Sequence, residues 1–159
     1  MNQKKLSLWL KAIIICVGIC GLAVYFGILP NIGDAFHAQF PEFVAWHWPW
    51  LIFLWCTAIP CYAVLALGWK IATRIGEDRS FSLENAKLLQ YIAWLVAGDI
   101  LFFFVGNTVF FFLSMNHPGI LLISLLICAI GIAIAITVAC LSHLVRKAAN
   151  LQEQSDLTV

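Results

Sequence analysis

Charged residues are scarce in this sequence. Only 11% of its 159 residues are Asp, Glu, Lys or Arg, and 63% are hydrophobic, whereas soluble proteins carry about 25% and about 45–50% of these classes. Nine cations and eight anions cannot solvate the surface of a chain of this length. The composition therefore disfavours a cytosolic enzyme, a disordered chain and a free nucleic-acid-binding domain.

Familiar catalytic patterns are also missing. The sequence has no Gly-rich phosphate loop, no zinc-protease motif and no Ser/His/Asp arrangement. Its six cysteines include no Cys-x-x-Cys pair, which disfavours a thiol or quinone redox enzyme. We expect all six to pack as small apolar residues, and we expect a non-enzymatic protein without a cofactor. These cysteines are Cys16, Cys20, Cys56, Cys61, Cys128 and Cys140.

Long apolar runs take up most of the chain. Four of them, residues 7–29, 51–72, 91–113 and 120–144, reach the length of about 20 residues that a helix needs to cross a membrane. The short links between them leave no room for a separate globular domain. We therefore predict an all-α protein, a transmembrane four-helix up-down bundle formed by one integral membrane domain over residues 1–159.

The positive charges divide the chain into two sides. Residues 30–50 join the first and second spans, and residues 114–119 join the third and fourth. Neither link contains Lys or Arg. The positive-inside rule then places both termini and the middle loop in the cytoplasm of a multi-pass protein of the bacterial cell (inner) membrane. All nine cations lie on the predicted inner side: Lys4, Lys5, Lys11, Lys70, Arg74, Arg79, Lys87, Arg146 and Lys147.

Tryptophan residues cluster where the predicted spans meet the membrane interface. Trp46, Trp48 and Trp50 precede the second span on the predicted outer side, where indole rings anchor at the headgroups. Apolar residues at helical intervals between positions 34 and 50 predict a short amphipathic element that lies along the outer leaflet.

Asp99 is an acidic residue in the middle of the third apolar run. Burying its carboxylate costs about 2.5–3.5 kcal/mol on the insertion scale, so we expect it to face the bundle interior. Desolvation favours the neutral acid, which can donate a hydrogen bond to another helix. Asn107, eight residues further along, falls roughly 80° round the helix and can border the same interior sector. The pair is a candidate intramembrane polar site, although interhelical hydrogen bonding explains it as well.

Three histidines lie in the predicted outer loops. His37, His47 and His117 are weak candidates for a metal site, because no two of them have the spacing of a helical metal-binding pair. We expect no metal.

Small residues recur at four-residue intervals in the spans, as at Gly131 and Ala135. They allow close helix contacts within one chain or between copies in a homo-oligomer. The segment after the fourth span carries a short apolar stripe between charges, which suggests a docking surface for a cytosolic partner. The candidate docking residues are Arg146, Lys147, Leu151, Asp156 and Leu157.

Three local motifs resemble a known family. Residues 80–82 (Ser-Phe-Ser), residues 116–119 (Asn-His-Pro-Gly) and the ending at residues 151–159 are similar to DUF2975, a family of bacterial polytopic membrane proteins. The resemblance covers nearly the whole chain and implies, by association, a small cytosolic helix-turn-helix transcription regulator as partner. We therefore expect a regulatory or sensory membrane protein that does not itself bind nucleic acid. The alternative is a small transporter, or a transporter subunit, that uses Asp99 as a proton or cation site.

Overall fold

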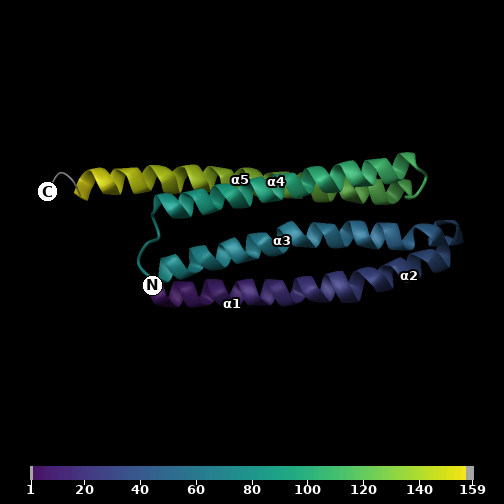
Figure 1. Ribbon diagram of the computed structural model, residues 1–159, viewed down its shortest axis with the longest axis horizontal. Coiled ribbons are helices and arrows are strands. Elements are labelled where there is room, and N and C mark those ends of the chain that lie inside the picture. The colour runs from purple at the N-terminus through teal and green to yellow at the C-terminus, as the bar shows by residue number, and fades with distance from the viewer. Residues whose placement is uncertain (1, 157–159) are drawn as a thin grey trace.

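The computed structural model describes residues 2–156, apart from the side chains of His37, Phe43 and Asp156, and this part of the chain is helical with short turns and no strand. Figure 1 shows long helices running side by side. In chain order they are α1 (Gln3–Leu22), a π-helical turn (Ala23–Ile28), α2 (Leu29–Gln39), a 3-10 turn (Pro41–Trp46), α3 (His47–Gly76), α4 (Leu83–Phe112) and α5 (Pro118–Asp156).

Four helical segments are long and apolar enough to cross a membrane, as predicted. They are Gln3–Phe36, Val44–Gly76, Leu83–Phe112 and Pro118–Ser155. Each overlaps one of the predicted spans and is longer, because a helix continues into the interface until a turn stops it. Many large aliphatic side chains on the outside of the bundle are exposed, including Ile59 and Leu126, which fits hydrocarbon as the surrounding solvent.

The segment before α3 differs from its prediction. Instead of a separate helix along the membrane surface, residues 34–39 complete α2, which prolongs the first spanning helix beyond the π-helical turn. Pro41 then opens the 3-10 turn that leads into α3. The apolar positions of this segment are thus divided between the end of α2, the 3-10 turn and the start of α3. Pro30 does not end the first spanning helix, because it occupies the first turn of α2, where proline is tolerated.

Successive helices run up and down, which confirms the predicted all-α bundle. Backbone contacts join α1 to α3, α3 to α4 and α4 to α5 (Figure 1). Within residues 2–156, α1 does not approach α4 or α5 at the backbone level. The molecule thus consists of two helical hairpins, α1/α3 and α4/α5, joined along α3 and α4 and separated between α1 and α5.

Glycines mark the closest approaches between the helices. A Cβ atom at Gly106 of α4 would collide with the ring of Phe53 on α3. A Cβ atom at Gly131 of α5 would lie 2.8 Å from Ile100 on α4. Such distances are too short for any side chain, so glycine allows the backbones to come together.

Serine hydroxyls join neighbouring helices near the end that carries all Lys and Arg, here called the basic end. Ser7 of α1 donates a 2.6 Å hydrogen bond to the carbonyl of Ala72 on α3. Ser142 of α5 donates a 2.7 Å bond to the carbonyl of Ala86 on α4. Both serines are buried. Because no water reaches their hydroxyls, each finds its hydrogen-bond partner on the neighbouring helix. The opposite end of the bundle is here called the loop end.

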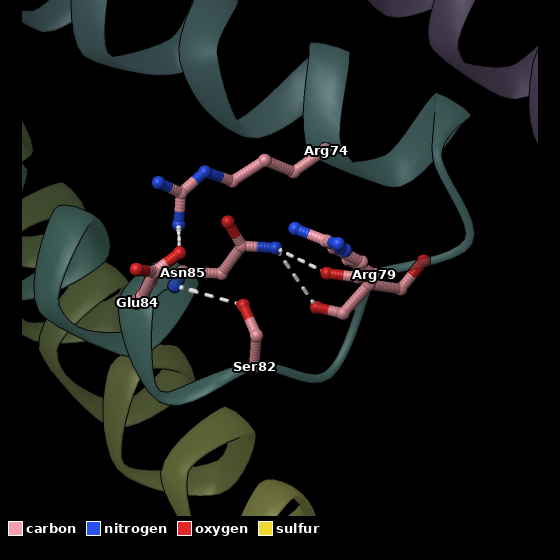
Figure 2. A network of polar contacts seen from close by, with 6 residues as sticks. Arg74, Arg79, Ser82, Glu84 and Asn85 are labelled. Atoms are coloured by element: carbon pink, nitrogen blue, oxygen red, sulfur yellow. Dashed lines mark hydrogen bonds and ion pairs between the residues drawn. The ribbon is translucent and has the colours of Figure 1, made fainter.

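The link between α3 and α4 is ordered by side chains (Figure 2). Asp78 adopts a left-handed φ of 60° just after α3, and Ser82 caps α4 by accepting a 3.2 Å bond from the backbone N–H of Asn85. The buried Asn85 amide donates to the carbonyls of Arg79 and Ser80 at 2.9 and 3.1 Å. An ion pair joins Arg74 to Glu84, and the loop therefore fixes how α3 meets α4.

Candidate functional site

Two adjoining cavities lie between the hairpins. One, toward the loop end, has a volume of about 460 Å³, and the other, nearer the middle of the bundle, about 600 Å³. Both volumes fall in the range of about 300–1,000 Å³ typical of ligand pockets. No Lys or Arg lines either one. The walls they share are apolar: Leu29, Leu54, Phe103 and Ile127.

Two helix irregularities border the larger cavity. Tyr25 belongs to the π-helical turn after α1, and Pro60 lies inside α3, and both line this cavity. A proline within a helix removes one backbone hydrogen bond, and π-helical turns are frequent at functional sites. The indole N–H of Trp55 donates a 3.0 Å bond to the carbonyl of Tyr25, so α3 stabilises the π-helical turn. Of these two irregularities, the sequence indicated only the one in α3, through Pro60.

Asp99 lines the larger cavity from α4 and is half-buried. Its Oδ2 accepts a 3.6 Å hydrogen bond from the thiol of Cys61 on α3. Its Oδ1 has no hydrogen-bond partner among the described residues. Sequence reasoning placed Asp99 toward the bundle interior, and the structure places it there. One long hydrogen bond from a thiol does not satisfy both oxygens of a carboxyl group. Interhelical hydrogen bonding therefore does not fully explain Asp99.

A line of polar groups continues from Asp99 toward α1. Cys61 lies 3.8 Å from the hydroxyl of Tyr25, and that hydroxyl forms a 3.1 Å hydrogen bond with Thr57. Thr57 in turn donates a 2.7 Å bond to the carbonyl of Leu54. Three helical segments thus contribute to one polar chain in otherwise apolar walls. Tyr25 and Thr57 were not singled out in the sequence, because neither residue type is unusual in a membrane span.

Asn107 lies in the other cavity. It is buried, donates a 2.9 Å bond to the carbonyl of Phe103 one turn earlier, and accepts a 3.2 Å bond from the amide of Asn116. Asn116 belongs to the turn between α4 and α5, so this pair holds the turn against α4. Asp99 and Asn107 line adjoining cavities but belong to different hydrogen-bond groups.

The three outer histidines do not form a cluster in the described residues. The side chain of His37 lies outside them, and His117 Nδ1 accepts a 3.1 Å bond from the backbone N–H of Gly119. His47 packs at Gly33, where a Cβ atom would lie 2.9 Å from its ring. In the part of the chain that the structure describes, no three His, Cys, Asp or Glu side chains are grouped as a metal site would require.

The cysteines are free thiols in the described structure. Cys128 is buried, whereas the other five are exposed on helices inside the predicted spans. Cys61 is the exception to our expectation of plain apolar packing, because its thiol contacts Asp99 and Tyr25.

Most of the candidate docking residues lie on the last turns of α5. Arg146 donates a 2.8 Å hydrogen bond to Gln90 of α4, whereas Lys147 and Leu151 are exposed. The side chain of Asp156, and Leu157 as a whole, lie outside the described residues. Figure 1 shows the end of α5 extending past the start of α4 and past the N-terminus.

Comparisons with known proteins agree with the membrane-spanning architecture. The chain is 28% identical to the "Uncharacterized membrane protein YoaS" of Bacillus subtilis (strain 168) over 161 residues, which covers 100% of both chains. No solved structure matches the chain significantly. The sequence profile of the family described as "Protein of unknown function (DUF2975)" matches residues 31–159. The protein is therefore a polytopic membrane protein that belongs to the DUF2975 family.

Proposed function

We propose that the protein is a non-enzymatic regulatory membrane protein that holds a small cytosolic helix-turn-helix transcription regulator on the projecting end of α5. The observation that carries this proposal is the length of α5. Its 39 residues rise about 58 Å, whereas the hydrocarbon core is about 30 Å thick. The last turns project past the other helices at the basic end (Figure 1), and we infer that they extend into water.

The surface of this extension suits a protein partner. Leu144 and Leu151 are 61% and 57% exposed and lie seven residues apart, which places them on the same face of the helix. Lys147 stands beside them in the sequence and is exposed. An apolar stripe flanked by charge is the pattern by which a helix docks in a groove. With the positive-inside orientation, this surface faces the cytoplasm.

The extension is mechanically connected to the bundle. Ser142 bonds to the carbonyl of Ala86, and Arg146 bonds to Gln90, so the base of the extension is fixed to α4. The loop held by Asn85 links α4 to α3. A change in the angle between the two hairpins would therefore move the projecting end of α5 relative to the membrane and alter the partner's access to it.

Co-purification tests this proposal. The full-length protein, solubilised in detergent, should retain a co-expressed small helix-turn-helix regulator, and deletion of residues 150–159 should abolish that retention. A charge on the stripe, Leu151→Glu, should weaken retention in the same way. The matched control is Gln152→Glu, which adds the same charge at an exposed position on the same turn of α5 but outside the stripe. Unchanged recovery after the deletion would exclude the tail as the docking surface.

A second candidate function is a small transporter, or a transporter subunit, with Asp99 as its proton or cation site. It is favoured by the Oδ1 atom that lacks a partner in the wall of the larger cavity. Proteoliposomes loaded with a pH-sensitive dye should then show a proton flux that Asp99→Asn abolishes without unfolding the bundle. A lower unfolding temperature together with unchanged flux would make Asp99 a structural residue.

A further inference from the structure

We propose that the larger cavity binds a lipophilic cation, specifically an alkylammonium amphiphile that enters from the bilayer and pairs its ammonium group with Asp99. This inference deepens the second candidate function by naming the ligand class, and it rests on the same carboxyl. It is independent of the proposal for α5, because binding is measured on the purified protein without any cytosolic partner.

The shape of the cavity favours a ligand from the membrane. Its lining comes from α1, α3, α4 and α5, and α1 makes no backbone contact with α5 in the described structure. The residues of these two helices that line the cavity, Val17, Gly21, Ile127, Cys128 and Gly131, lie within the spanning segments. We infer that the cavity opens between them to hydrocarbon rather than to water. A ligand that reaches this space through that opening must dissolve in the bilayer, which requires an apolar body.

The chemistry of the walls selects the charge of the head group. Among the residues that the structure describes, Asp99 is the only acidic side chain that lines the larger cavity, and no Lys or Arg lines either cavity. Within the same residues, one carboxyl oxygen has no partner, and the other accepts a single contact of 3.6 Å from a thiol. A charged N–H group forms stronger bonds to a carboxylate than a thiol does. An anionic amphiphile would meet no positive charge among the residues that line either cavity.

The remaining space accepts the apolar body. The smaller cavity adjoins the larger one on the side of the loop end, and Phe103 and Ile127 line both. Asn107 lies eight residues from Asp99 on α4, which corresponds to about 12 Å along the helix. An alkyl chain held at Asp99 by its head group can therefore extend toward the loop end through walls that are almost entirely apolar. The aromatic ring of Tyr25 borders the head-group region and can also interact with a cation.

The test compares two ligands of equal chain length in lipid nanodiscs that contain the full-length protein. Dodecylammonium is charged at pH 7, because an alkylamine has a pKa of about 10.4, and dodecanol is its uncharged counterpart. Radiolabelled ligand bound to empty nanodiscs is subtracted as the partition background. We expect saturable binding of dodecylammonium and a clear preference for it over dodecanol.

Two variants locate the site. Asp99→Asn should lower the affinity for dodecylammonium by at least ~10-fold, the loss expected when one partner of a desolvated charge pair is removed, and should change the affinity for dodecanol by less than about 2-fold. Ile127→Trp fills the junction of the two cavities and should weaken both ligands. The matched control is Asp34→Asn, which removes an exposed carboxyl near the loop end and should leave both affinities unchanged.

Three results would overturn the proposal. Equal affinity of wild type and Asp99→Asn for dodecylammonium would mean that the carboxyl does not hold the ligand. Binding no greater than in empty nanodiscs would mean that the cavity holds only bulk lipid chains. Dimers in nanodiscs that Ile127→Trp dissociates would mean that a second copy of the chain fills the opening. If Asp99→Asn fails to fold, two other results decide the question. The wild type should prefer dodecylammonium to dodecanol, and Ile127→Trp should bind dodecylammonium more weakly than the wild type does. None of these measurements depends on retention of the cytosolic regulator.

Discussion

The ring of Phe53 on α3 packs where Gly106 on α4 leaves room for it, and this contact holds the two hairpins together. The same ring lies 5.1 Å from Phe102 and 5.2 Å from Phe110, measured between centroids. Phe53 is 8% exposed in a bundle where many large apolar side chains face lipid. The contact therefore anchors the seam along which the backbones of the two hairpins meet in residues 2–156.

Gly106→Ala should destabilise the bundle by about 1–3 kcal/mol, the usual cost of overpacking. The added Cβ atom would collide with the ring of Phe53. Thermal unfolding in nanodiscs measures the effect. The matched control is Gly98→Ala on the same helix, where a Cβ atom meets nothing within 4 Å. That change should be neutral or stabilising by up to about 1 kcal/mol, because alanine favours helix. Equal stability of the two variants would contradict the packing at Phe53.

Ser142→Ala should lower stability by about 0.6 kcal/mol, the average for an interhelical hydrogen bond in a membrane. It removes the 2.7 Å bond to the carbonyl of Ala86. Thr137→Val is the control, because Thr137 bonds only to the carbonyl of Ala133 in its own helix. The same unfolding measurement compares them. If Thr137→Val costs as much as Ser142→Ala, the bond between α4 and α5 carries no special weight.

Asn85→Ala should loosen the link between α3 and α4. It removes both part-buried amide bonds to the carbonyls of Arg79 and Ser80, each of which contributes about 0.5–1.5 kcal/mol. Trypsin should then cleave after Arg79 several times faster in the detergent-solubilised protein. Asn150→Ala, at an exposed position on α5, is the control and should leave the cleavage rate unchanged.

Cysteine labelling tests the orientation that the charges predict. In a variant whose six native cysteines are replaced, Glu42→Cys at the loop end should react with a membrane-impermeant maleimide in intact cells. Glu77→Cys in the link between α3 and α4 should react only after permeabilisation. Both positions are exposed, so a difference in labelling reports the side of the membrane. The reverse pattern would place the basic end outside and would also remove the basis for a cytosolic partner at α5.

The number and type of the helices could be predicted because the sequence has few charges and four apolar runs of sufficient length. The ends of the helices could not. Residues 30–39 continue a helix despite Pro30, and α5 continues to Asp156, because helices extend into the interface until a turn or cap stops them. The start of α4 is set by Ser82, whose hydroxyl accepts the bond from the backbone N–H of Asn85.

Of the residues that line the larger cavity, the sequence indicated Asp99 as a candidate site residue. Asp99 was conspicuous because a carboxyl within hydrocarbon is costly, and Asn107 was placed near it by helical periodicity. Their true partners, Cys61 and Asn116, come from other helices and turns. No periodicity within one helix indicates which residue of another helix lies opposite.

What the sequence alone determined is the set of membrane-crossing helices, because the cost of placing charge in hydrocarbon depends only on composition along the chain. What only the tertiary structure decided is how those helices meet. The backbones of α3 and α4 approach at Gly106, while α1 and α5 stay apart and leave cavities that Asp99 and Asn107 border. Helix association within a membrane depends on local shape and on a few hydrogen bonds rather than on hydrophobicity, so these contacts follow from three-dimensional fit and not from apolar pattern.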